Sequence, residues 1–535
     1  MSAQKNRVAT GGRVDRSKPV RFSFDGKTYY GYQGDTLASA LLANGVTLVG
    51  RSFKYHRPRG IVTAGPEEPN ALVEIGTGAY REPNTRAPQV ELYDGLVTTS
   101  QNRWPSLDFD IGAVNSVMSR FIPSGFYYKT FKWPKDGWLF YEKFIRRAAG
   151  LGTGSTETDP DRYDKVYGHC DVMVVGGGPA GLAAALAAGR AGARVVLVDE
   201  QSELGGSLLS ERERTVDGKP AHEWVAAATA ELASLPEVRV LTRTTAFAYL
   251  DANMLSCVER LTDHIGPSAK GPRQRLWRIR AKEVILATGA IERPLVYSDN
   301  DRPGCMLASA ARTYVNRYGT TPGQRVVIMT NNDTAYQTAL DLTAAGVSVA
   351  AVVDLRANPT GALPQAARAK GIEIIENSAI TQVKGTKQVR EVEVQSLTQD
   401  ATGVVGSARH IYCDTVLSSG GWQPTVHLHS QTRAKVVWDD GIQAFIPGPI
   451  MPGQNNRSVG SARGNFGLDA GLKEGHQAGA EAAAKFGFSN VTGNAPSADA
   501  EPTSQPLRSV WIVPSNVPVG QGGKHFVDYQ NDVTA

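Results

Sequence analysis

Three glycines, Gly176, Gly178 and Gly181, form a Gly-x-Gly-x-x-Gly motif between an apolar, β-branched run and an Ala-rich segment. In a strand–turn–helix context the first glycine permits a tight turn, the second lets backbone approach a pyrophosphate, and the third lets the helix pack on the strand. The N–H groups at the start of such a helix are donors for phosphate. The motif therefore predicts a dinucleotide site.

An acidic pair stands at the distance that this site requires. Residues 195–198 form a second apolar strand, and Asp199 and Glu200 follow it. An acid ~20 residues after the glycines accepts hydrogen bonds from a ribose diol, and the count favours Asp199. Ser207 ends a Gly-rich loop that could reach the pyrophosphate from the other side. Residues 239–247 alternate as a strand that would lie beside the adenine.

A second strand–helix–strand unit is predicted at residues 325–353, and it ends at Asp354. Its glycines are missing, because Thr330, Asn332 and Ala335 stand where a fingerprint should be. Side chains there occupy the space in which backbone must approach phosphate. We therefore expect a Rossmann scaffold kept for packing rather than a working pyridine-nucleotide site.

Several other segments carry local signals. Asp25-Gly26 between two alternating runs predicts a β-hairpin with a type I′ turn. Further expected elements are a helix at 36–44, a strand at 71–75 and a helix at 470–485. His427 and His429 could face one way on a strand, but two histidines without a third ligand are more often structural.

Two surface hypotheses follow from composition. Arg51, Lys54, Arg57 and Arg59 form the densest basic cluster; they could contact an FMN phosphate or a partner subunit, but a solvated basic face is favoured. Residues 104–150 are rich in aromatic side chains, which suits either a buried interdomain or intersubunit surface or simple core packing. This stretch includes Phe121, Phe126, Tyr127, Tyr128, Phe131, Trp133, Trp138, Phe140, Tyr141 and Phe144.

Composition narrows the function classes. The chain has 535 residues and a net charge of only +5, with scattered basic residues, so no nucleic-acid partner is indicated. Neither a membrane span nor a signal peptide is visible, which favours a cytoplasmic protein. The four cysteines, Cys170, Cys257, Cys305 and Cys413, are far apart, so we expect free thiols and no metal site.

Five motifs together resemble the α subunits of heterotetrameric sarcosine oxidases and of related amine and opine oxidases. They are Gly34-Asp-Thr-Leu-Ala-Ser-Ala-Leu-Leu, Phe53-Lys-Tyr-His-Arg-Pro-Arg-Gly60, Ala287-Thr-Gly-Ala-Ile-Glu-Arg-Pro294, Ser419-Gly-Gly-Trp422 and Phe526-Val-Asp-Tyr-Gln-Asn-Asp-Val533. The resemblance implies an α/β fold with two dinucleotide-binding, glutathione-reductase-like Rossmann domains, preceded by a ferredoxin-like α+β domain. Some relatives hold a [2Fe–2S] cluster in that domain. Since this chain has no cysteine before Cys170, we expect a cluster-free domain and no iron–sulfur cluster.

The resemblance also divides the chain. Residues 1–165 would hold the ferredoxin-like domain and an aromatic-rich connector, and residues 166–290 with 411–490 the first Rossmann domain. Residues 291–410 would form the second, degenerate Rossmann domain. Residues 491–535 would be a bridge to a C-terminal folate-binding domain that this sequence does not contain.

Site residues carried over from the family concern the nucleotide alone. The pyrophosphate would be contacted by Gly176, Gly178, Ala180 and Gly181, and the ribose by Asp199 together with Glu200. Ser207 would contact a phosphate, and Ala246 would pair with the adenine through its backbone. Two further residues, Ser461 and Leu468, would lie near the second nucleotide. FAD enzymes of this architecture usually carry an Asp after the last strand, where this chain has Ser461. The family thus implies NAD in the first Rossmann domain, with FAD as the alternative.

The implied function is that of an NAD-binding α subunit in a flavin-dependent N-methyl amino acid (sarcosine) oxidase. In that family FAD in a β subunit oxidises the amine, and FMN lies at the interface of α and β. The implied partners are a flavin-binding β subunit, a small γ subunit and a zinc-binding δ subunit. No residues here combine a general base with a nucleophile, so we assign no catalytic residue to this chain. Alternatives are an opine oxidase or methylglutamate dehydrogenase subunit, or a self-sufficient FAD/NAD(P)H-dependent flavin reductase.

Overall fold

The computed structural model describes residues 4–121, 131, 133–134, 137–149, 152–489, 492–515 and 523–535. The chain forms two compact units, each built from separate stretches of sequence. The composite unit contains residues 1–160, 293–421 and 507–535. The glycine-motif unit contains residues 161–292 and 422–506.

The composite unit begins with a five-stranded sheet in the order β2-β1-β7-β5-β6. Its strands are β1 (Asp15–Phe24), β2 (Lys27–Gln33), β5 (Leu72–Ile75), β6 (Glu82–Arg86) and β7 (Leu96–Ser100). The helix α1 (Leu37–Ala43) has all seven residues buried and starts with a capping box of Thr36 and Ser39. Asp25 and Gly26 have positive φ, as a type I′ turn requires, so the predicted hairpin is confirmed.

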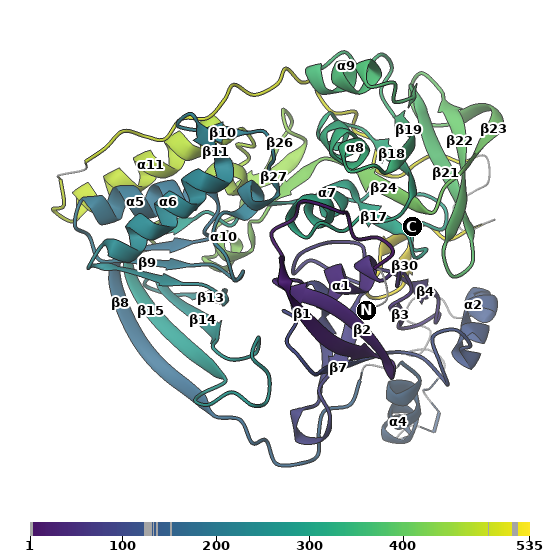
Figure 1. Cartoon of the computed structure of the whole chain (residues 1–535), viewed down its shortest axis with the longest axis horizontal. Helices are drawn as coiled ribbons and strands as arrows, with labels where there is room; N and C mark the ends of the chain where they lie inside the picture. The colour runs from purple at the N-terminus through teal and green to yellow at the C-terminus, as the bar shows by residue number, and fades with distance from the viewer. Residues whose placement is uncertain are drawn as a thin grey trace. The chain divides into compact units, whose positions relative to one another are not determined.

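The second Rossmann sheet, in the same unit, has five parallel strands in the order β17-β24-β18-β19-β20. These are β17 (Cys305–Leu307), β18 (Arg325–Thr330), β19 (Ser348–Asp354), β20 (Ile374–Ile375) and β24 (Thr415–Ser419). Helices α7 (Ala308–Arg317), α8 (Thr334–Ala344) and α9 (Ala362–Ala369) accompany it, together with an antiparallel sheet of β21 (Ser378–Gly385), β22 (Val389–Leu397) and β23 (Val404–Tyr412) (Figure 1). The predicted second strand–helix–strand unit is thus present.

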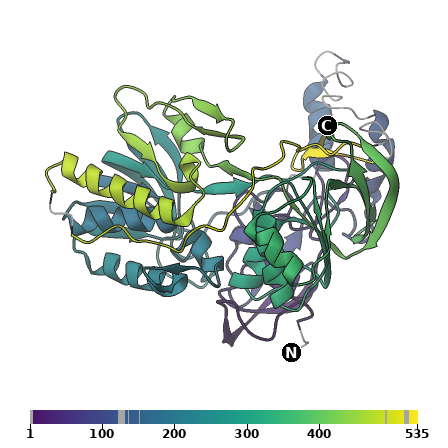
Figure 2. The same cartoon turned by 90° about the horizontal axis from the view of Figure 1, so that it is seen from above.

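The glycine-motif unit is built on a larger sheet. Its parallel strands are β8 (Tyr163–Val175), β9 (Val195–Val198), β12 (Val238–Leu241), β15 (Gln274–Leu286) and β28 (Asn456–Ser458), with the antiparallel pair β13 (Thr244–Leu250) and β14 (Met254–Arg260) added beside β15. Along the parallel part the strands follow the chain order 3-2-1-4-5, as in a nucleotide-binding Rossmann half. Helices α5 (Pro179–Arg190) and α11 (Leu468–Lys485) lie side by side in both views (Figures 1 and 2), and α6 (Ala221–Ser234) packs against α5.

Two local predictions are wrong. The expected strand at 239–247 is two strands, β12 and β13, separated by Thr242 and by Arg243, whose φ is positive. His427 and His429 lie on a short helix, α10 (His427–Gln431), rather than on a strand, and His429 is buried. In both cases the alternation in the sequence was too short to determine the backbone conformation.

The basic cluster is not a solvated face. Arg51, Arg57 and Arg59 are buried, and Arg59 is only 1% exposed. Arg57 Nε lies 2.6 Å from Asp301 Oδ2, and Arg59 pairs with Asp301 and with Asp532 in the C-terminal segment. Burial by itself lowers the pKa of the Arg57 guanidinium, but the neighbouring Asp301 and Asp299 carboxylates outweigh this and hold that pKa above its ordinary value. The cluster therefore links distant parts of the composite unit.

The aromatic stretch does not pack as core. Four of its described members, Phe121, Trp133, Phe140 and Phe144, are between 62% and 83% exposed, the last two on α4 (Trp138–Ala149). Phe126, Tyr127 and Tyr128 lie outside the described residues. Among the described residues, no helix combines the length and the apolar character that crossing a membrane requires.

Candidate dinucleotide-binding site

The turn between β8 and α5 has a conformation that only glycine fits. Gly176 has φ of +104°, and a Cβ there would lie 2.3 Å from the Ala287 carbonyl oxygen. A Cβ on Gly181 would lie 1.8 Å from the Gly176 carbonyl oxygen. At Gly178, by contrast, an added Cβ would meet only the Gly206 Cα, at 3.9 Å. The loop thus leaves open space beside Gly178, which a side chain would fill and a pyrophosphate could occupy.

The start of α5 is suited to an anion. Its N-cap is Gly178, which offers no side-chain cap, and Pro179 occupies the first turn. Helix N-termini carry N–H groups without an intrahelical partner and a partial positive charge, so they bind phosphate well.

Asp199 is held beside the glycine loop by backbone donors. Its carboxylate accepts the Gly177 N–H at 2.6 Å and the Gln201 N–H at 2.8 Å. The residue follows β9 directly and keeps part of its surface exposed, as does Glu200. The Glu200 carbonyl oxygen accepts a hydrogen bond from the Arg260 guanidinium at 2.7 Å. Asp199 is therefore the acid that the fold fixes next to the turn.

The loop before Ser207 also approaches the turn. The Gly205 N–H donates to the Gly177 carbonyl oxygen at 2.8 Å, and a Cβ on Gly206 would lie 2.9 Å from the Gly178 Cα. Ser207 is exposed, one residue beyond this approach. Ala246 lies on β13, two residues after Thr244, whose N–H donates to the Asp199 carbonyl oxygen at 2.7 Å. The fold thus gathers both segments near the acid.

The last strand and helix complete the arrangement. A Cβ on Gly460 would lie 2.9 Å from the Ala180 Cβ, so Ser461 follows a residue that touches the first turn of α5. The Gly460 N–H donates to Glu474 Oε2 at 2.7 Å. Leu468 is the first residue of α11, and its N–H donates to Glu501.

Sequence reasoning missed the glycines of α11. A Cβ on Gly475 or Gly479 would lie 2.1 Å from the carbonyl oxygen of Ala180 or Ala184, respectively. These glycines let α11 approach α5 closely and so support the start of that helix. Their spacing of four residues, continued from Gly471, is the signal that could have revealed them.

The cysteines take no part in this site. All four are buried free thiols, as predicted. Burial raises the pKa of Cys170 and Cys257 to about 12, so these two thiols in the glycine-motif unit stay protonated near neutral pH.

A glycine turn, a helix N-terminus and an acid after the second strand together define a dinucleotide-binding oxidoreductase fold. Comparison with known families agrees, because the family model described as pyridine nucleotide-disulphide oxidoreductase matches residues 170–444. This chain belongs to that family.

Its more specific relatives are sarcosine oxidase α subunits. The chain is 47% identical over 98% of its length to sarcosine oxidase subunit alpha of Rhizobium meliloti (strain 1021), covering 52% of that protein. It is 38% identical, over 98% of its length and 49% of the relative, to the subunit of the same name from Corynebacterium sp. (strain P-1). The chain therefore spans about half the length of these curated relatives. The resemblance inferred from the motifs is confirmed.

A solved structure shares the fold. L-proline dehydrogenase from P. horikoshii matches with a TM-score of 0.59 and 20% identity, over 90% of this chain and 76% of that one. At this identity the match supports the fold alone.

The prediction for the N-terminal domain is wrong. A family model described as a 2Fe-2S iron-sulfur cluster binding domain matches residues 17–103, which overturns both the cluster-free domain and the exclusion of an iron–sulfur cluster. The prediction failed because it considered only the cysteine ligands. The family match depends on the whole segment, which includes the sheet around β1 and the buried helix α1.

Proposed function

We propose that this chain is the NAD-binding part of an α subunit in a heteromeric flavin-dependent sarcosine oxidase. The observation that carries this proposal is the open glycine turn with Asp199 beside it, in a chain 47% identical to a sarcosine oxidase subunit alpha. The chain is an oxidoreductase subunit by family. In the proposed complex the β subunit oxidises the N-methyl amino acid.

The residues of the first Rossmann sheet fit a dinucleotide. Gly176, Gly178, Ala180 and Gly181 would surround the pyrophosphate at the start of α5, and Asp199 would accept hydrogen bonds from the ribose. Ser207, Ala246, Glu200, Ser461 and Leu468 complete the proposed set. Bound NAD supplies a nicotinamide that can carry a hydride. The role of this chain is to bind and orient the dinucleotide.

NAD is favoured over FAD because of the segment after β28. Ser461 stands where FAD enzymes of this architecture usually have an Asp. The preceding Gly460 N–H is bonded to Glu474 within the chain, at 2.7 Å. Both features support a ligand held through its adenosine and pyrophosphate.

In the proposed complex, the flavins are assigned to the β subunit and to its interface with this chain. FAD would be carried by a β subunit, and FMN would lie at the interface of the α and β subunits. Arg57 and Arg59 do not support direct contact with an FMN phosphate, because both guanidinium groups already pair with buried carboxylates. Further proposed partners are a small γ subunit and a zinc-binding δ subunit.

Exposed aromatic side chains support the existence of a partner. Phe121, Trp133, Phe140 and Phe144 are more than 60% exposed in the composite unit. Phe140 and Phe144 also contact each other, with ring centroids 5.1 Å apart, and exposed apolar patches on a protein surface commonly mark a protein–protein interface. We assign this surface to a partner subunit of the oxidase.

Purification of the complex from the native source tests the proposal. We expect a flavin-containing β chain to copurify with this chain, and NAD to be released on denaturation. The double variant Phe140→Ser/Phe144→Ser should lose the β chain while retaining NAD, because the aromatic residues and the glycine turn belong to different units of the chain. A chain that purifies alone and reduces flavin with NAD(P)H would contradict the proposal.

A further inference from the structure

The second Rossmann sheet presents an edge at which a dinucleotide would be expected. Thr330 at the end of β18 is paired in register with Asp354 of β19 and Ser419 of β24, so three parallel strands end together. Ligands of open α/β sheets bind outside such carboxyl ends. The family of the chain implies a pyridine nucleotide at this position. The question is therefore whether the residues at these strand ends leave free groups that could bind one.

Asn332 occupies the position of the phosphate-binding glycine. Its Oδ1 accepts the Thr334 N–H at 3.0 Å and the Thr334 hydroxyl at 2.6 Å, and its Nδ2 donates to Ser419 Oγ at 3.0 Å. The residue is only 7% exposed. A side-chain amide thus satisfies a donor at the start of α8 that a phosphate would otherwise bind.

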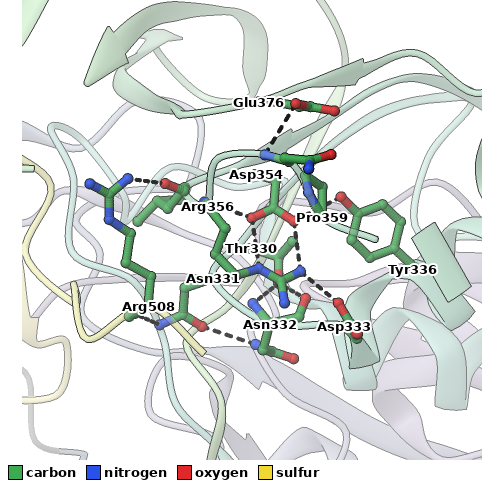
Figure 3. A network of polar contacts seen from close by, with 12 residues as sticks. Thr330, Asn331, Asn332, Asp333, Tyr336, Asp354, Arg356, Pro359, Glu376 and Arg508 are labelled. Carbon is green, nitrogen blue, oxygen red and sulfur yellow. Dashed lines mark hydrogen bonds and ion pairs between the residues drawn. The ribbon is translucent and has the colours of Figure 1, made fainter. Parts of the chain in front are cut away.

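Asp354, the acid after the second strand, is also engaged. Its Oδ2 accepts the Tyr336 hydroxyl at 2.8 Å and the Arg356 guanidinium at 2.8 Å, and its Oδ1 accepts the Arg356 N–H at 2.8 Å (Figure 3). Asp354 is fully buried. Burial and the nearby carboxylate raise the pKa of Tyr336 well above its ordinary value, so its hydroxyl stays a donor. A ribose would have to displace these groups.

Arg356 connects this acid to the helix. Its guanidinium lies 2.7 Å from Asp333 Oδ1 as well as 2.8 Å from Asp354 Oδ2. Arg356 is 7% exposed, and Asp333 is the N-cap residue of α8. A guanidinium therefore bridges the two points that, in a working site, would face ribose and phosphate.

A segment from the end of the chain lies against the same edge. The Arg508 N–H donates to the Asn331 carbonyl oxygen at 3.0 Å, and Asn331 Nδ2 donates back to the Arg508 carbonyl oxygen at 3.0 Å. The Arg508 guanidinium donates to Asn377 Oδ1 and to the Gln399 carbonyl oxygen, both at 2.8 Å. Trp511 Nε1 donates to the Gly420 carbonyl oxygen at 2.8 Å.

We infer that the second Rossmann sheet has exchanged its dinucleotide for residues of its own chain: Asn332, Asp354 and Arg356 fill the phosphate and ribose positions, and the edge anchors the segment at residues 507–513 through Asn331. Asn331 is fully buried and forms both a backbone and a side-chain hydrogen bond with that segment. The edge is thus a peptide-docking site with a fixed intramolecular occupant.

Hydrogen–deuterium exchange of the purified chain, with and without NADH or NADPH at millimolar concentration, tests this inference. Neither nucleotide should change exchange at residues 331–336 or 507–513. Asn331→Ala should raise exchange of 507–513 at least tenfold. Ser348→Ala is the matched control, because Ser348 lies at the opposite end of β19 and bonds to Arg325; it should leave the segment unchanged.

A second variant keeps the test decisive if Asn331→Ala does not fold. Arg508→Ala removes the guanidinium bonds from the segment side and should raise exchange of the same residues. Protection of 331–336 by NADH or NADPH, with release of 507–513, would overturn the inference. Unchanged exchange of 507–513 in a folded Asn331→Ala or Arg508→Ala protein would also overturn it.

Discussion

The two Rossmann sheets have the same strand–turn–helix topology, but the residues at their turns differ in kind. In the glycine-motif unit, Gly176 and Gly181 let backbone segments approach closely, and Gly178 leaves open space beside the turn. In the composite unit, Thr330, Asn332 and Ala335 fill that space with buried side chains. The comparison teaches that a nucleotide-binding fold persists without its ligand when side chains satisfy the helix N-terminus instead.

The acids after the second strands differ in the same way. Asp199 accepts backbone N–H groups and keeps part of its surface exposed. Asp354 is buried and bonded to Tyr336 and Arg356. Both acids stand directly after the second strand of their Rossmann unit. Their exposure and hydrogen-bond partners, rather than their sequence position, decide which one can bind a ribose.

The largest effect is expected from placing a methyl group on the third glycine. Gly181→Ala puts a Cβ 1.8 Å from the Gly176 carbonyl oxygen, so the turn must move. We expect a loss of about 4 kcal/mol in the free energy of unfolding and complete loss of bound dinucleotide. Urea denaturation measures the free energy of unfolding, and analysis of the released nucleotide measures the bound dinucleotide.

The matched variant in the other sheet is Ala335→Gly. It should cost only about 1 kcal/mol, because it changes helix propensity and leaves the turn intact. Equal losses in the two variants would mean that the two turns do not differ as described.

Removal of the second acid should affect stability without affecting the ligand. Asp354→Ala leaves the buried Arg356 guanidinium and Tyr336 hydroxyl without a shared partner. Breaking a buried ion pair costs about 3–5 kcal/mol, so the urea midpoint should fall clearly. The folded fraction should keep its full content of dinucleotide. An unchanged midpoint would show that the network contributes nothing to folding.

The smallest expected effect concerns the reactivity of the cysteine thiols, which should not differ between the two Rossmann sheets. Burial raises the pKa of Cys170 and Cys257 in one unit, and of Cys413 in the other, to about 12, and it raises the pKa of Cys305 as well. At pH 8 roughly one such thiol in ten thousand is ionised. Reaction with Ellman's reagent should therefore be very slow in the native protein, rise with pH, and reach four thiols per chain after unfolding. Rapid reaction of one native thiol would contradict this.

Local patterns in the sequence predicted the parts of the fold that depend on neighbours in the chain. The strand Val195–Val198, the hairpin turn at Asp25 and the loss of glycines at Thr330 were all visible in this way. In each case the backbone requirement and the residue type lie within a few positions of each other.

The rest depends on contacts between distant segments. Arg59 resembled a surface residue because its partners, Asp301 and Asp532, lie hundreds of positions away. The anchoring of Arg508 by Asn331 joins residues 177 positions apart. Pairings of this kind cannot be read from composition or periodicity.

The most direct test of the contrast between the two sheets is the amount of dinucleotide released on denaturation from wild type, Asp199→Ala and Asp354→Ala, measured by mass spectrometry per folded chain. We predict one NAD per chain in wild type, at least a tenfold lower amount in Asp199→Ala after dialysis, which corresponds to about 1.4 kcal/mol of binding energy, and an unchanged amount in Asp354→Ala. Equal losses in both variants, or a loss confined to Asp354→Ala, would contradict the assignment of the dinucleotide to the first Rossmann sheet.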